Sequence, residues 1–121
     1  MHTLRKATNE ELYSLLNELK DSDKAVIVEG HKDKLALEGF DIKNIFTLHA
    51  PLYKLVEFVS SNFKEVAILT DLDKEGKKLY GELNARLQER GVKVDNKLRH
   101  FLFKNTKLRQ IEGLQTYLKN H

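Results

Sequence analysis

Short apolar runs alternate with segments of helical periodicity along this chain, and that alternation most constrains its fold. The apolar runs are KAVIVEG (24–30), NIFTL (44–48), EVAILT (65–70) and the shorter VKV (92–94). The first run has no polar alternation, which is typical of a strand covered on both faces. Strands that alternate with helices in this way predict right-handed crossovers and a parallel sheet between helical layers.

The segments between the runs carry helix signals. Thr8 followed by Glu11 indicates a capping box ahead of leucines at helical spacing, which predicts a helix over 9–20. Glycines and a proline bound the next helices, which we expect over 32–38, 51–62 and 74–90. The residues from about 96 onward predict one or two more. We therefore expect an α/β protein with an N-terminal helix and a helical C-terminal extension.

Length and composition limit the class of protein. The 121 residues, 40% of them hydrophobic, suit one domain over 1–121. The absence of cysteine excludes disulfides and thiolate metal sites and favours an intracellular location. No apolar run approaches the roughly 20 residues that span a bilayer, and no signal-peptide pattern opens the chain. We expect a soluble, cytoplasmic protein with no membrane partner.

Charge is distributed unevenly along the chain. The net charge is +3, but residues 1–73 carry −4 and residues 74–121 carry +7. This asymmetry indicates a polyanion such as nucleic acid as the partner. A lysine-rich, solvated helix face would explain it equally well.

Acidic residues follow two of the apolar runs. Glu29 ends the first run, and Asp71 and Asp73 follow the third. Ligands of open α/β sheets bind beyond the carboxyl ends of the strands, and for a 2-1-3-4 order the binding crevice lies between strands 1 and 3. The three carboxylates would meet there and repel one another unless a cation or a shared proton neutralises them. A hard divalent ion, Mg²⁺ with Mn²⁺ as the second candidate, is the natural occupant.

Each of these residues has a simpler explanation when taken alone. A single aspartate at a strand-to-helix junction is most often a helix cap, and a single glutamate after a strand is most often a solvated loop residue. Gly30 and Gly76 would serve tight turns, or they would let a phosphate approach the backbone at a helix N-terminus. The combined placement of the three carboxylates favours a site.

Two stretches carry a family resemblance: VIVEGHKDKLAL and, some forty residues later, AILTDLDKEGKKL. Together they resemble the Toprim domain, whose glutamate-glycine pair and D-x-D-x-x-G motif match Glu29, Gly30, Asp71, Asp73 and Gly76. The resemblance covers about 24–95 and leaves 96–121 as an extension. It implies a Rossmann-like, four-stranded parallel sheet of order 2-1-3-4. The plan is closest to the maturase-type ribonucleases, without their larger C-terminal RNA-binding region.

The resemblance also implies roles for individual residues. Asp71, Asp73 and Glu29 would hold Mg²⁺, and Glu29 would be the general acid/base of phosphodiester hydrolysis or transfer on DNA or RNA. Contacts with phosphate or nucleic acid are expected from the neighbouring residues Gly30, Lys32, Asp33, Gly76, Lys74, Lys77 and Lys78.

Other classes of function are weighed against this one. A non-catalytic Toprim module would use the same site to recruit nucleic acid or protein within a larger complex. A receiver domain phosphorylated at Asp71 is disfavoured, because the first strand ends in a single glutamate and only one clear strand follows the third. A haloacid-dehalogenase D-x-D would follow the first strand rather than the third. The apolar C-terminal segment leaves a homodimer or a protein partner open.

Overall fold

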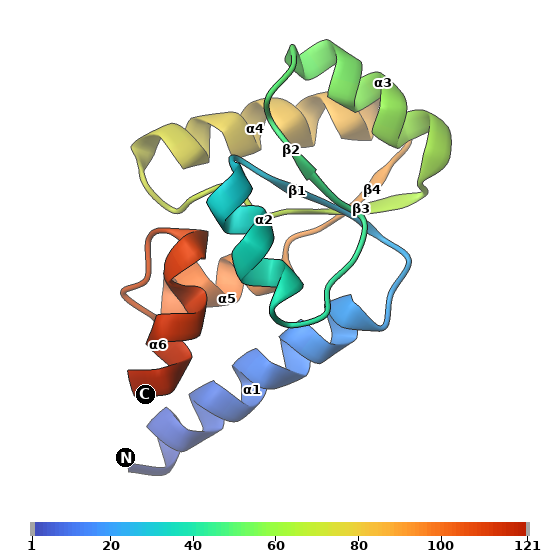
Figure 1. Ribbon diagram of the computed structural model, residues 1–121. Coiled ribbons are helices and arrows are strands. Elements are labelled where there is room, and N and C mark those ends of the chain that lie inside the picture. The colour runs from blue at the N-terminus through green and yellow to red at the C-terminus, as the bar shows by residue number, and fades with distance from the viewer. Residues whose placement is uncertain (1, 121) are drawn as a thin grey trace.

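A parallel sheet lies at the centre of the computed structural model, which describes residues 2–120, with side chains from Asn9 onward (Figure 1). Its strands are β1 (Ala25–Val28), β2 (Ile45–Thr47), β3 (Glu65–Ile68) and β4 (Lys93–Asp95). All pairings are parallel, and the order is β2-β1-β3-β4. The predicted α/β class and the 2-1-3-4 order are therefore confirmed.

Helices cover both faces of the sheet (Figure 1). They are α1 (His2–Lys20), α2 (His31–Glu38), α3 (Leu52–Asn62), α4 (Lys74–Glu89), α5 (Lys97–Asn105), the 3₁₀ helix η1 (Ile111–Gly113) and α6 (Leu114–Asn120). The helix expected over 9–20 begins at His2, because neither glycine nor proline interrupts the preceding residues. Thr8 therefore lies inside α1 and not at its cap. Among residues 2–120, no helix has the length and apolar character needed to cross a membrane.

Two apolar cores fill the spaces between the sheet and its helices. Alternate residues of β1 point to opposite faces: Ala25 and Ile27 pack under α3 and α4, and Val26 and Val28 pack against α1, α2 and α5. All four are buried, which explains the absence of polar alternation in this run. The core that contains Val26 and Val28 also contains residues of η1 and α6. The C-terminal extension thus shares a core with the sheet.

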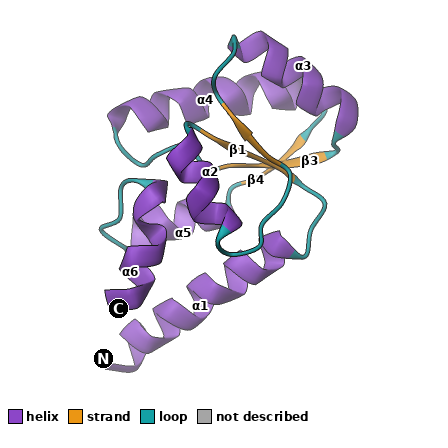
Figure 2. Ribbon diagram, viewed as in Figure 1, coloured by secondary structure: helices purple, strands orange, loops and turns teal. Residues whose placement is uncertain are grey.

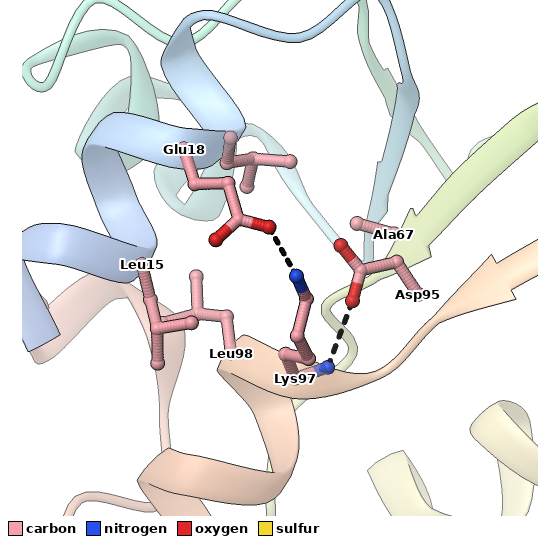
Figure 3. A pocket seen from close by; sticks show the side chains of 7 residues that line it. Leu15, Glu18, Ala67, Asp95, Lys97 and Leu98 are labelled. Carbon is pink, nitrogen blue, oxygen red and sulfur yellow. Dashed lines mark hydrogen bonds and ion pairs between the residues drawn. The ribbon is translucent and has the colours of Figure 1, made fainter. Parts of the chain in front are cut away.

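A mostly buried ion pair ties the start of β1 to the end of β4. Lys24 Nζ donates to Asp95 Oδ2 at 2.6 Å and lies 3.6 Å from Glu65 Oε2. Figure 3 shows Asp95 beside a small cavity of about 10 Å³ between α1, α5 and the sheet. At the mouth of this cavity Lys97 Nζ pairs with Glu18 of α1, and the Lys97 N–H donates to Asp95 Oδ1 at 3.0 Å.

The turn between β3 and α4 depends on a glycine. A Cβ on Gly76 would lie 1.9 Å from the carbonyl oxygen of Asp71, so no side chain fits there. The Thr70 hydroxyl donates to the Gly76 carbonyl at 2.7 Å, and Asp73 caps α4 by accepting the Gly76 N–H at 2.8 Å. The close approach at Gly76 is therefore to the chain's own backbone, which accounts for this glycine without a phosphate.

Gly76→Ala should lower the free energy of unfolding by about 3 kcal/mol, because a backbone clash must be relieved by moving the Asp71 peptide. Gly81→Ala, in the middle of the same helix, is the matched control, since a Cβ there meets nothing within 4 Å. That control should stabilise the protein by about 0.5–1 kcal/mol. Urea unfolding followed by circular dichroism measures both, and equal effects would contradict the tight turn.

Lys24→Met should lower the free energy of unfolding at pH 7 by about 1.5–3 kcal/mol, because Asp95 loses a hydrogen bond from a charged donor. Burial raises the pKa of Asp95, but the hydrogen bond from Lys24, with help from the Lys97 N–H, outweighs burial and lowers that pKa. A lowered carboxyl pKa stabilises the fold above the unfolded-state pKa, and this contribution disappears as pH falls through the folded-state pKa. Urea unfolding at pH 7 and pH 3 should therefore show a smaller difference at pH 3.

Lys97→Met serves as the control for this ion pair. Its partner Glu18 and Lys97 itself are 46% and 55% exposed, so the variant should change stability by at most about 1 kcal/mol at pH 7. An equal loss of unfolding free energy in both variants would show that burial of the Lys24–Asp95 pair adds nothing to stability.

Candidate functional site

The strands β1 and β3 are the two central strands of the sheet, and the loops that follow them meet at its carboxyl edge (Figure 2). Glu29 directly follows β1, and its Oε2 accepts the Asp71 N–H at 2.6 Å. This hydrogen bond joins residues 42 positions apart. Glu29 and Asp71, which sequence reasoning expected at one edge, are thus in direct contact.

Asp71 also anchors the C-terminal extension. Its Oδ1 accepts the N–H of Ile111 at 2.9 Å. Its carbonyl accepts Arg99 Nη2 at 2.9 Å, and Arg99 Nε donates to the Thr70 carbonyl at 3.2 Å. The Leu72 N–H donates to the Arg109 carbonyl at 2.7 Å. The loop after β3 is therefore held by α5 and by the segment that leads into η1.

Asp33 has a structural role in this arrangement. The side chain is only 6% exposed, and its Oδ2 accepts the Gly30 N–H at 3.1 Å. The backbone N–H of Glu112 in η1 also favours the charged form of this carboxyl and acts against the rise of its pKa. Asp33 thus has a role at the start of α2, and its predicted contact with phosphate or nucleic acid stays a prediction. A Cβ on Gly30 would find Asp33 Oδ2 at an ordinary 3.9 Å, so steric need does not explain this glycine.

The remaining predicted site residues lie on the surface around these carboxylates. Asp73 is exposed and uses Oδ1 to cap α4. The four predicted lysines are all exposed, at the starts of α2 and α4: Lys32, Lys74, Lys77 and Lys78. They flank the acidic loops from two helices.

The carboxyl groups of the site repel one another. Burial, opposed by the hydrogen bond from Asp71 and reinforced by the charges of Asp71, Asp73 and Asp33, raises the pKa of Glu29. Burial also raises the pKa of Asp71 above its ordinary value, although the Ile111 N–H and Arg99 act in the opposite direction. Burial and the Asp71 charge raise the pKa of Asp33. The site therefore carries negative charge that a cation would stabilise.

The three predicted metal ligands are hard oxygen donors, and each gives one oxygen to a backbone N–H. Among the described side chains, from Asn9 to Asn120, no group of three His, Cys, Asp or Glu is close enough to hold a metal ion, so the three predicted ligands do not converge. Mg²⁺ commonly binds through one or two carboxylates and keeps several waters, so it does not require three converging side chains. The hard oxygen donors fit this mode of binding.

Sequence reasoning did not foresee how the C-terminal segment closes the site. Arg99 was noticeable as one cation of a basic half, but its contact with two backbone carbonyls has no sequence signature. The partners of Asp71 and Asp33 on η1 are backbone N–H groups, which every residue other than proline carries. Neither pairing could have been found from residue types.

Three kinds of comparison with known proteins bear on this chain. It is 36% identical over 116 residues to a UPF0292 protein of Methanocaldococcus jannaschii, covering 90% of this chain and 91% of that protein. It is 36% identical over 115 residues to a UPF0292 protein of Methanosarcina barkeri, covering 90% and 79%. A solved structure of an Aquifex aeolicus protein matches with a TM-score of 0.76 and 30% identity, over 85% of this chain and 94% of that one. No family model matches.

The solved structure supports the α/β architecture described above, because it matches at high coverage and at an identity that also indicates homology. Both UPF0292 relatives match over 90% of this chain. The chain belongs to the UPF0292 family.

Proposed function

We propose that this protein carries out Mg²⁺-dependent phosphodiester chemistry on nucleic acid, as a protein of Toprim type. The observation that carries the proposal is the contact between Glu29 and Asp71 at the crevice between the two central strands. Ligands of open α/β sheets bind at such a crevice. The mutual repulsion of the carboxylates there supports a divalent cation as part of the active state.

The roles proposed for the residues come from the Toprim resemblance. One or two of the carboxylates of Asp71, Asp73 and Glu29 would hold Mg²⁺, with waters completing its coordination, and the bound ion would neutralise charge on a non-bridging phosphate oxygen. Glu29 has Oε2 occupied by the Asp71 N–H, which orients the carboxylate and leaves Oε1 to take or give a proton. The lysines at the starts of α2 and α4 would contact flanking phosphates. Water would be the nucleophile in a hydrolase.

A non-catalytic binding module is the second candidate. It is favoured by the hydrogen bonds that Asp71 accepts from Ile111 and that Asp33 accepts from Gly30, because they give both carboxylates a structural role. In that case the site would recruit nucleic acid or a protein within a larger complex. Either proposal is compatible with a cytoplasmic location and with a homodimer.

Mg²⁺ at about 10 mM should raise the free energy of unfolding by about 1.4–2.7 kcal/mol, if the dissociation constant lies between about 0.1 and 1 mM, because the ion binds only the folded state. Asp71→Asn with Asp73→Asn should abolish this response. Asparagine keeps an oxygen for the Ile111 and Gly76 N–H groups, so the double variant should fold and should be at least as stable without metal. Calorimetric titration and thermal unfolding measure both effects.

The chain offers a matched control for this double variant. Asp21 and Asp23 form a second D-x-D, exposed in the turn after α1 and remote from the site. Asp21→Asn with Asp23→Asn should leave Mg²⁺ binding unchanged. Equal binding by the wild type and both double variants would refute the proposed metal ligands.

Glu29→Gln separates an enzyme from a binding module. The amide keeps an oxygen for the Asp71 N–H but cannot transfer a proton, so Mg²⁺-dependent cleavage should fall by about 10²–10⁴. The measurement is cleavage of labelled single- and double-stranded DNA and RNA with Mg²⁺, Mn²⁺ or EDTA. Glu57→Gln, within α3 and outside both acidic loops, should keep wild-type turnover.

The binding module makes a different forecast for the same set of assays. Pure wild-type protein would then cleave none of the four substrates with either metal, yet would bind nucleic acid in EDTA. That result would replace the enzyme proposal by the module.

A further inference from the structure

An open cleft of about 440 Å³ lies between α4 and α5, beside the acidic site. It is lined by Lys77, Tyr80, Asn96, Arg99, His100 and Phe103. None of these six carries a carboxylate, although three carboxylates follow the strands nearby. The cleft therefore favours anionic ligands, whereas the acidic site favours cations. Arg99 connects the two, because it lines the cleft and donates to the Asp71 carbonyl.

Aromatic rings and cations alternate in this cleft. The guanidinium of Arg99 lies 4.5 Å from the centroid of the Tyr80 ring. Phe103 is 42% exposed, with Lys77 Nζ at 4.4 Å and the Arg109 guanidinium at 5.2 Å from its ring centroid. An exposed Phe at this position adds little to the core, since the buried residues of this helix are Leu98, Phe101 and Leu102.

The chemistry of these groups matches a nucleotide. An exposed ring is a platform for a base, because every base has a π-face, and adjacent cations attract the phosphates. A cation over an exposed Phe ring is held weakly, so Lys77 or Arg109 can leave the ring for a phosphate when a base takes its place. Bases in a duplex are already stacked and paired, so a stacking platform selects unpaired strands.

We propose that the α4–α5 cleft binds single-stranded nucleic acid, with one base stacked on Phe103 and the adjoining phosphates contacted by Lys77, Arg99 and Arg109. This proposal rests on the proposed function and narrows its substrate class. A strand bound there leads directly to the acidic site, because Arg99 belongs to the cleft and also holds the loop of Asp71. The sequence had left single and double strands undistinguished.

The test is fluorescence anisotropy of the full-length chain in EDTA, so that Mg²⁺-dependent cleavage cannot occur. The probes are fluorescein-labelled 12-nucleotide strands of DNA and of RNA, the corresponding duplexes, and an abasic DNA strand of the same length. Single strands should bind at least about fivefold more tightly than the duplexes and the abasic strand, because only unpaired bases can stack. The DNA and RNA arms show which sugar is preferred.

Phe103→Leu should weaken the binding of single strands by about fivefold or more and leave the affinity for the abasic strand unchanged. Phe103→Tyr, which keeps a ring, should retain wild-type affinity. Phe58→Leu is the matched control, since Phe58 is 47% exposed on α3 and does not line the cleft. Thermal unfolding of each variant verifies that the fold is intact.

The outcomes separate this inference from the proposed function. Equal affinities of the Phe103→Leu and Phe58→Leu variants for single strands, or equal affinities of wild type for abasic and complete strands, would overturn base stacking in this cleft. Mg²⁺ binding and Glu29-dependent cleavage would then still support the proposed function. Absence of binding to every nucleic acid would overturn both.

Discussion

The arrangement around the Asp71 peptide is the constraint on which the rest of the site depends. Its N–H donates to Glu29, its carbonyl accepts from Arg99, and its side chain accepts from Ile111. The same peptide lies so close to Gly76 that no side chain fits between them. Strand β1, helix α4, helix α5 and η1 are thus fixed relative to one residue, and a shift of this peptide would disturb all four at once.

This anchoring concentrates negative charge that the protein itself does not neutralise. Arg99 is the cation nearest to Asp71, but its hydrogen bonds go to backbone carbonyls and not to the carboxylates. Desolvation and repulsion therefore disfavour ionisation of Glu29 and Asp71 in the fold, a cost that falls as pH is lowered through their raised pKa values. A bound cation would remove the same cost at neutral pH. Because linkage is reciprocal, a cation that helps a phosphate to bind would itself be held more tightly when the phosphate is present.

The sequence was sufficient for the architecture but only for part of the site. The apolar runs and the helical spacing predicted the strands, since a run buried on both faces such as 25–28 leaves a clear signal. The strand order came from the Toprim resemblance, and the structure confirms it. Pairing of Glu29 with Asp71 followed from parallel strands ending at one edge. The early start of α1 was missed because a capping signal at Thr8 also occurs inside a helix. The burial of Asp33 was missed because the groups that surround it include the backbone of η1, whose position depends on how the chain returns after α5.

The C-terminal extension is therefore a structural part of the site. Without it Asp71 Oδ1 and the Leu72 N–H would lose their partners, and buried Leu102, Ile111 and Leu114 would no longer cover the sheet. The loss of hydrogen-bond partners leaves polar groups to be satisfied by water, which loosens the loop that orients Glu29. The segment 24–95, which carries the recognisable motif, thus contains the carboxylates but not the groups that hold them in place. Precise placement of a reactive carboxylate depends on supporting hydrogen bonds around it, and here those bonds come from residues beyond the motif.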